Sequence, residues 1–219
     1  MQRCKKYNIC IENHRLTIIY NILYEDDFKY IKNCNLSNIK NLNNIVYASA
    51  WQKGIHKIIE IFDYIIKIDN NIKLILLSPG YDLHNYIEYK KYLIKKYPNN
   101  LIILGKLNKY DYANIIKSSL CVLSTSFSET FGCVFSESYY LGTHVIADFR
   151  SGALKEIIDN NFIINYDNPN QVYLKIKYLQ KNHATLNIKL DEKFLLDTNL
   201  KIWLELVKSP LAKAPKYPE

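Results

Sequence analysis

Two glutamates with a glycine between them have the residue types and spacing of a ligand site. Glu129 and Glu137 are separated by seven residues, and the step Phe131-Gly132 lies between them. Glycine lets the backbone approach a ligand closely, and the N–H groups at a helix start favour an anion such as a diphosphate. Carboxylates beside such an anion suit neutral hydroxyl groups, because one carboxylate can accept hydrogen bonds from two of them. The stretch 124–148 therefore has the residues to bind a sugar or ribose next to a diphosphate.

A strand, a loop and a helix must position these residues. The run 120–124 is apolar, as is typical of a buried strand, and apolar residues recur at helical spacing after Gly132. Helical side chains lean toward the N-terminus, so Glu137 points back toward the loop that carries Glu129. A structural role also fits, because Ser126 and Glu129 have the spacing of a capping box and Glu137 suits a solvated helix position.

Strands alternate with helices from residue 45 onward, which predicts an α/β fold with a doubly wound, Rossmann-like parallel sheet. The predicted strands are 45–50, 72–78, 101–104, 120–124, 145–147 and 162–165. The predicted helices include 51–69, 82–97 and 108–118, the last with Asn108 as N-cap. Ligands in such sheets bind at the carboxyl ends of the strands, near the point where the strand order reverses. The loop with Glu129 leaves a strand at that edge.

Three regions are predicted along the chain. Residues 1–44 form an N-terminal segment and linker with a strand over 16–23, and residues 45–181 form the sheet domain. Residues 182–219 form a tail, in which apolar residues at helical spacing predict an amphipathic helix over 191–207 before a disordered end.

Composition limits the classes of function. The chain has 219 residues, of which 48% are hydrophobic and 23% charged, as in ordinary globular proteins. Its five cysteines include no C-x-x-C pair, which favours a reducing, cytoplasmic compartment over a disulfide scaffold or a zinc site. The histidines are scattered without metal-ligand spacing, and no apolar run approaches the ~18 residues of a membrane span. The net charge of +8 suits an anionic ligand or a nucleic acid.

The paired glutamates resemble the donor-site signature of retaining glycosyltransferases of the GT-B fold. The resemblance runs from about Ile45 to Gln180 and includes Glu129-x7-Glu137, Phe131-Gly132 and the segment 141–147. The sequence departs from the family pattern at Ser138, where the family has a small apolar residue, and at His144, where it has proline. The resemblance implies a single GT-B-type half that binds a nucleotide diphosphate sugar. It further implies sugar transfer with retention, of the hexosyltransferase type, to an unknown acceptor such as a glycan, lipid or protein, without a cofactor or a metal.

The resemblance also implies roles for individual residues. Glu129 takes the catalytic position at the donor sugar, and Glu137 holds the ribose hydroxyls. Lys53 and Gly54 match the element that grips the donor diphosphate. The nucleotide base is expected against the backbone of Gly105, Lys106 and Leu107, and the remaining expected donor contacts are Ser128, Phe131, Gly132, Cys133, Val134 and Arg150.

The diphosphate element departs from the family form G-R-x-x-x-K-G. The chain reads Ser49-Ala50-Trp51 where the family has its arginine, although Lys53-Gly54 matches. A single lysine still neutralises a phosphate as a point charge. Arg150 is a candidate replacement for the missing arginine. The alternative is that Lys53 and Arg150 are ordinary solvated residues.

A complete enzyme of this kind has a second Rossmann-like domain for the acceptor, and the segment before Ile45 is too short to form one. The sequence therefore predicts a donor half, acting with a separate acceptor-binding chain or inactive alone, or a non-catalytic binding module. A sugar-nucleotide epimerase would need a second domain with catalytic acids. Lysines and tyrosines over 86–97 suggest nucleic-acid contact, but their periodicity favours an amphipathic helix on a sheet.

Overall fold

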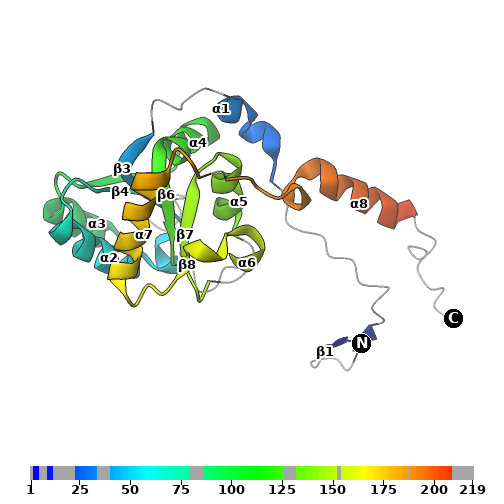
Figure 1. Ribbon diagram of the computed structural model, residues 1–219, viewed down its shortest axis with the longest axis horizontal. Coiled ribbons are helices and arrows are strands. Elements are labelled where there is room, and N and C mark those ends of the chain that lie inside the picture. Colours follow the sequence, from blue (N-terminus) through cyan, green and yellow to red (C-terminus); the bar gives the residue numbers. More distant parts are fainter. Residues whose placement is uncertain are drawn as a thin grey trace. The chain divides into compact units, whose positions relative to one another are not determined.

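The computed structural model describes residues 2–4, 9–11, 23–33, 40–78, 86–125, 132–151, 154–186 and 188–208. The chain divides into two compact units. One unit is Leu23–Asp191, and the other combines Met1–Ile22 with Glu192–Glu219. The larger unit contains a six-stranded sheet with helices beside it (Figure 1).

All six strands of this sheet are parallel, which confirms the predicted doubly wound fold. Their spatial order is β5-β4-β3-β6-β7-β8, the order of a Rossmann-like sheet. The direction of winding reverses between β3 and β6, so this is the expected place for a ligand. The strands are β3 (Asn41–Ala48), β4 (Lys73–Leu77), β5 (Leu101–Leu104), β6 (Ser119–Ser124), β7 (His144–Asp148) and β8 (Ile163–Ile164).

Helices connect successive strands. Figure 1 shows α2 and α3 to one side of the sheet and α5 and α6 to the other, as right-handed crossovers require when the winding reverses. Helix α7, which follows β8, packs on α2. The helices are α2 (Ile55–Ile68), α3 (Ile87–Lys96), α4 (Lys109–Ser118), α5 (Cys133–Tyr140), α6 (Leu154–Ile157) and α7 (Pro169–Asn182), with 3-10 turns at η3 (Trp51–Lys53) and η5 (Asn160–Phe162).

The core lies between the sheet and these helices. The central strand β6 is buried at every residue, and the inner face of α2 buries Ile58, Phe62 and Ile65. Strands covered on both faces are expected to be apolar throughout, as β6 is over Leu120–Leu123.

Several predicted boundaries shift for local reasons. The helix predicted over 51–69 is divided, because Gly54 has φ 130° and separates η3 from α2. Strand β3 begins at Asn41, before the predicted residue 45, and its pairing with β6 changes register between Asn41 and Ile45. The predicted cap of α4 is confirmed, since the Asn108 side chain accepts from the Asp111 N–H at 2.8 Å.

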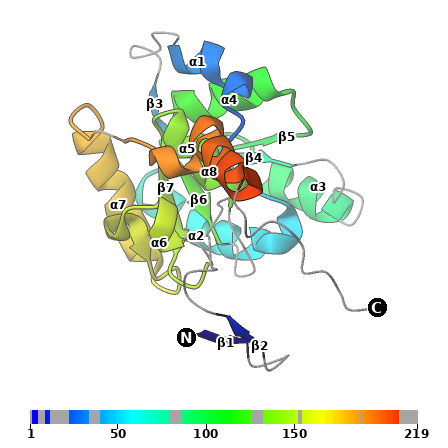
Figure 2. The same cartoon turned by 90° about the vertical axis from the view of Figure 1, so that its right-hand side faces the viewer.

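Part of the predicted N-terminal segment packs with the larger unit. It forms η2 (Glu25–Asp27) and α1 (Lys29–Asn33), and α1 lies beside α4 (Figure 1 and Figure 2). Phe28 and Ile31 are buried, and Lys117 of α4 donates to the carbonyl oxygens of Ile31 and Lys32 at 2.6 and 2.8 Å. The strand predicted over 16–23 lies outside the described residues, apart from Leu23.

The smaller unit contains an antiparallel pair, β1 (Gln2–Cys4) and β2 (Ile9–Ile11). It also contains η6 (Glu192–Phe194) and the helix α8 (Leu196–Lys208), which confirms the helix expected near the end of the chain. Exposed apolar side chains recur along α8 at Leu200, Trp203, Leu204 and Val207. The segment 210–219, predicted as a disordered end, lies outside the described residues.

Candidate functional site

A cavity of about 440 Å³ lies at the carboxyl ends of the strands, beside the point where the winding reverses. Four chain segments line it, and each follows a strand or begins a helix. The lining residues are Ala48, Ser49, Ala50 and Lys53 at and after the end of β3; Leu77 and Ser78 at the end of β4; Gly105, Lys106 and Leu107 after β5; Lys109 and Tyr112 in the first turn of α4; and Gly132, Cys133, Val134, Phe135 and Glu137 at the start of α5. This is the edge at which doubly wound sheets bind ligands.

The start of α5 borders the cavity. Gly132 precedes the helix with φ 78° and ψ 68°, a left-handed conformation that residues with a Cβ rarely adopt. A Cβ at Gly132 would collide with the Phe135 ring, so the glycine also allows this ring to pack under the turn. The positive end of the α5 dipole therefore faces the cavity and favours an anion there.

Glu137 lies in the second turn of α5, and its side chain is only 14% exposed. The Tyr112 hydroxyl donates to its Oε2 at 2.7 Å, and the Lys109 Nζ lies 3.5 Å from its Oε1. Burial raises the pKa of Glu137 above its usual value, while Tyr112 and Lys109 act in the opposite direction. The carboxylate is thus held in a partly desolvated position beside the cavity, where it can accept hydrogen bonds from hydroxyl groups.

Lys53 lies in η3 and lines the same cavity. The turn around it is close-packed, because a Cβ at Gly54 would collide with the Thr125 side chain. Thr125 in turn donates to the Gly54 carbonyl oxygen at 3.1 Å. Gly54 therefore shapes the turn that carries Lys53, although Gly54 is not among the lining residues.

The cavity brings together most of the residues that the sequence predicted for the donor site. Lys53, Gly105, Lys106, Leu107, Gly132, Cys133, Val134 and Glu137 all line it. The predicted residues Ser128, Glu129 and Phe131 lie in 126–131, outside the described residues. Their roles stay predictions.

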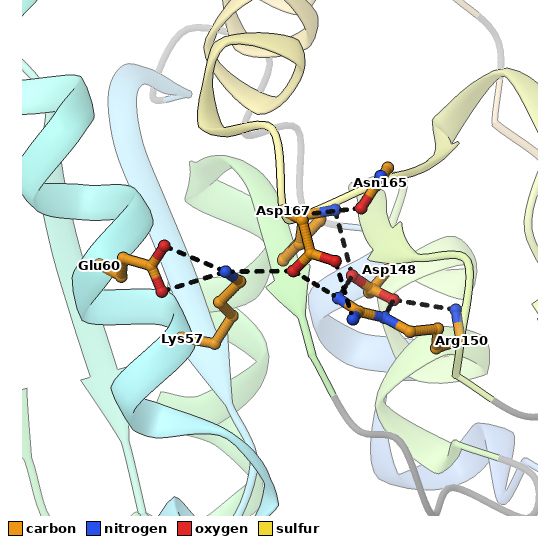
Figure 3. A network of polar contacts seen from close by, with 7 residues as sticks. Lys57, Glu60, Asp148, Arg150, Asn165 and Asp167 are labelled. Carbon is orange, nitrogen blue, oxygen red and sulfur yellow. Dashed lines mark hydrogen bonds and ion pairs between the residues drawn. The ribbon is translucent and has the colours of Figure 1, made fainter.

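Arg150 is not among the cavity-lining residues and instead takes part in a polar network after β7 (Figure 3). Its Nε and Nη2 donate to the two oxygens of Asp148 at 2.7 Å each, and its Nη1 and Nη2 donate to Asp167 at 3.0 and 3.1 Å. Lys57 of α2 extends the network to Asp167 and Glu60, at 3.2 and 3.0 Å. The arrangement joins α2, the end of β7 and the start of α7.

The carboxylate of Asp148 depends on this arginine. Its side chain is fully buried, which opposes ionisation, but hydrogen bonds from Arg150 and from the Tyr166 N–H lower its pKa below the usual value. The prediction that Arg150 replaces the family's arginine at the diphosphate is not supported by these contacts. Arg150 instead bonds to two carboxylates of the fold, those of Asp148 and Asp167.

Sequence reasoning missed Tyr112 and Lys109. Both lie on the first turn and a half of α4, three residues apart and hence on one helical face. The N-cap at Asn108 fixed the start of this helix from the sequence, and a helix that begins at a strand end presents its first residues to the ligand edge. The sequence therefore indicated that Lys109 and Tyr112 lie near the ligand edge. It did not indicate the contact between Tyr112 and Glu137, which are 25 residues apart.

Helix α3 contains the lysines and tyrosines that suggested nucleic-acid contact. Its Leu93 is buried, while Lys91 pairs with Glu88 and Lys96 pairs with Asp63, each at 2.7 Å. These ion pairs offset part of the positive charge of the helix. The contacts agree with an amphipathic helix that covers a sheet.

Within the described ranges, no three His, Cys, Asp or Glu side chains are grouped closely enough to hold a metal ion. The helices in the described part of the chain are also too short or too polar to cross a membrane.

The comparison with protein families gave a match over most of the chain. The model described as "Glycosyl transferases group 1" matches residues 29–194. A search of curated protein sequences found no match.

Solved structures resemble the fold. The glycosyltransferase from Rickettsia africae ESF-5 superposes with a TM-score of 0.70 at 22% identity, over 94% of this chain and 59% of that one. TarM gives 0.61 at 22% identity, over 89% and 38%. Anabaena HepE, solved in complex with UDP and glucose, gives 0.60 at 16% identity, over 87% and 54%. The chain thus spans between 38% and 59% of the length of these three structures.

Proposed function

Because the chain belongs to the glycosyl transferases group 1 family, we propose that its cavity binds the nucleotide diphosphate sugar of a glycosyl transfer reaction that retains configuration. The observation that carries the proposal is the convergence of Glu137 and the start of α5 on one cavity. A buried carboxylate that accepts hydroxyls, next to a helix end that favours anions, suits a ribose joined to a diphosphate.

The nucleotide would lie across the strand ends. Glu137 holds the ribose hydroxyls, and the segment Gly105 to Leu107 contacts the base. Lys53 and the amino end of α5 neutralise the diphosphate, and they stabilise the charge that grows on it when the sugar leaves. Glu129, which precedes α5 in the sequence, would contact the sugar. These groups need no metal for the departure of the diphosphate.

UDP is the nucleotide to test first, because HepE was solved in complex with UDP and glucose. We further propose that the sugar passes to an acceptor, which a separate domain or chain would bind. A cytoplasmic location, expected from the cysteines, stays a prediction.

A second candidate is a binding module without catalysis, or one half of a split enzyme. Ser49 lines the cavity at the place where the family signature has an arginine. One of the two positively charged side chains that bind the diphosphate in the family is therefore replaced by a neutral one. A module of this kind would bind the nucleotide and give no transfer by itself.

Calorimetric titration of UDP, GDP and their sugar conjugates tests the proposal. We expect one nucleotide to bind saturably to the wild type and not measurably to Glu137→Ala. Glu88→Ala is the matched control, because Glu88 is also a helical glutamate but its side chain is 84% exposed on α3. Absence of binding by every nucleotide, or equal binding by Glu137→Ala, would overturn the proposal.

Transfer or hydrolysis of the sugar separates the two candidates. Release of the sugar from the bound conjugate, by the chain alone or with acceptor fractions, supports the enzyme. Binding without any release supports the module or the half-enzyme.

A further inference from the structure

Glu137 is contacted on both carboxylate oxygens by residues from a single face of α4. The Tyr112 hydroxyl donates to Oε2 at 2.7 Å, and the Lys109 Nζ lies 3.5 Å from Oε1. Tyr112 is half-buried and lines the cavity together with Lys109 and Glu137. Burial and the Glu137 carboxylate raise the pKa of Tyr112 well above its usual value, so its hydroxyl stays protonated and donates.

The start of α4 is itself fixed. The Asn108 side chain accepts from the Asp111 N–H and also donates to the Asp111 carboxylate, both at 2.8 Å. Lys109 has a second acidic neighbour, since Asp27 of η2 lies 3.7 Å from its Nζ. Tyr112 therefore approaches Glu137 from a helix turn that is capped and that packs on η2 and α1.

Holding a glutamate in one orientation favours ligand binding. A free glutamate has several rotatable bonds, and a ligand that needs one orientation must freeze them at a cost in affinity. Each carboxylate oxygen accepts more than one hydrogen bond, so the bond from Tyr112 leaves acceptor capacity for two neighbouring hydroxyls.

We propose that Tyr112, with Lys109, positions Glu137 so that the cavity selects nucleotides with a 2′-hydroxyl over 2′-deoxynucleotides. The inference rests on the proposed function and adds to it two residues that the family signature does not contain. Tyr112 acts through Glu137 and is a positioning residue.

The first test compares Tyr112→Phe with the wild type by calorimetric titration of UDP, GDP and their 2′-deoxy forms. A hydrogen bond to a charged group corresponds to about tenfold or more in a binding constant. We expect the variant to bind the ribonucleotide about tenfold more weakly and the deoxynucleotide almost unchanged, so that selectivity falls. Tyr110→Phe is the matched control, since Tyr110 lies on the same helix, is 52% exposed and packs against Tyr30.

The second test measures the affinity for the ribonucleotide against pH. Among the described residues, the groups that face Glu137 are Tyr112 and Lys109 from α4 and Asp27 from η2, while Cys133 on the same helix as Glu137 acts on Tyr112. Tyr112 and Lys109 favour the ionised carboxylate, whereas burial and Asp27 oppose it. Binding is therefore lost on acidification, and this loss occurs at a higher pH in Tyr112→Phe. A purely structural defect would lower affinity by the same factor at every pH.

Lys109→Met provides an independent variant, because Lys109 is 58% exposed and contacts the other oxygen of Glu137. We expect that Lys109→Met, like Tyr112→Phe, loses its affinity for the ribonucleotide at a higher pH than the wild type. If the wild type binds neither nucleotide, the proposed function fails and this inference with it. If the wild type binds, while Tyr112→Phe and Lys109→Met keep its selectivity and its pH profile, this inference alone is overturned.

Discussion

At the residue scale, the described lining of the cavity lacks the arginine of the family signature. Lys53 is present, but Ser49 lines the cavity where the signature has an arginine. Arg150 is bonded to Asp148 and Asp167. The cavity also contains Lys106 and Lys109, and the latter is shared between Glu137 and Asp27.

Restoring the arginine is expected to strengthen binding. Ser49→Arg should raise the affinity for UDP by about tenfold, because a charge-assisted hydrogen bond to phosphate contributes about 1.5–3 kcal/mol, less what is needed to order the side chain. Calorimetric titration measures the change. Gln52→Arg is the control, since it adds the same charge at an exposed residue that does not line the cavity. Equal gains in both variants would show a general charge effect and contradict the placement of the diphosphate near Ser49.

Much of the site was predictable at this scale. Glu137 and the glycine before α5 were identified because their spacing is local and the helix period fixes their direction, and Lys53 because the sequence around it resembles the family's diphosphate element. Arg150 was a candidate for the diphosphate because it follows a predicted strand. Its partner Asp167 lies 17 residues away, and only the folded chain brings the two together. Tyr112 was missed for the same reason.

At the element scale, the network around Arg150 joins three elements. Asp148 ends β7, Asp167 precedes α7, and Lys57 lies in the first turn of α2 (Figure 3). The side chain of Asp148 is 0% exposed and that of Asp167 is 54% exposed, so the two ion pairs of Arg150 differ in their environment. The buried pair should therefore matter more for stability.

Removing the arginine leaves a buried carboxylate without its main partner. Arg150→Met is expected to lower the free energy of unfolding by roughly 2–4 kcal/mol. Asp167→Asn removes the exposed pairs with Arg150 and Lys57 and should cost less than Arg150→Met, because exposed ion pairs contribute little. Urea unfolding of both variants measures the difference. Equal losses would mean that the bond between Arg150 and Asp148 contributes no more than a surface pair.

Element boundaries were predictable where a local signal exists and not elsewhere. Strand β5 lies where its four apolar residues predicted it, and Asn108 caps α4 as expected. The break at Gly54 was missed, because its positive φ and the close approach of Thr125 are not visible in the local sequence.

At the scale of the whole molecule, one family departure affects the stability of the sheet. His144 begins β7 at the position where the family signature has proline, and its ring packs on Phe162 with centroids 4.5 Å apart. It is 8% exposed, and neither ring nitrogen has a hydrogen-bond partner among the described residues. Burial and the nearby charge of Lys40 lower the pKa of His144 to about 4.

This histidine makes the fold sensitive to acid. The folded pKa lies below the unfolded value of about 6.5, so the unfolded chain binds more protons between these two values. Stability should fall as the pH decreases from about 6.5 to 4, by about 2–3 kcal/mol from this group. Urea unfolding across this range measures it. In His144→Leu the slope should be smaller, whereas His183→Gln, at an exposed histidine, should keep the wild-type slope. An unchanged slope in His144→Leu would contradict the assignment.

The fold as a whole was predictable because alternating strands and helices leave few topologies. The parallel sheet and the ligand edge follow from right-handed crossovers and from the position of the winding reversal. The packing of 23–33 against α4 was not predictable, because it depends on Lys117 reaching the end of α1 from far along the chain.

The central claim is that the cavity at the strand ends holds a nucleotide diphosphate. A crystal structure of the chain with UDP tests it most directly. We expect the ribose hydroxyls to lie within hydrogen-bond distance of the Glu137 carboxylate. The diphosphate should lie between Lys53 and the start of α5. A nucleotide bound elsewhere, or with its ribose turned away from Glu137, would contradict the account.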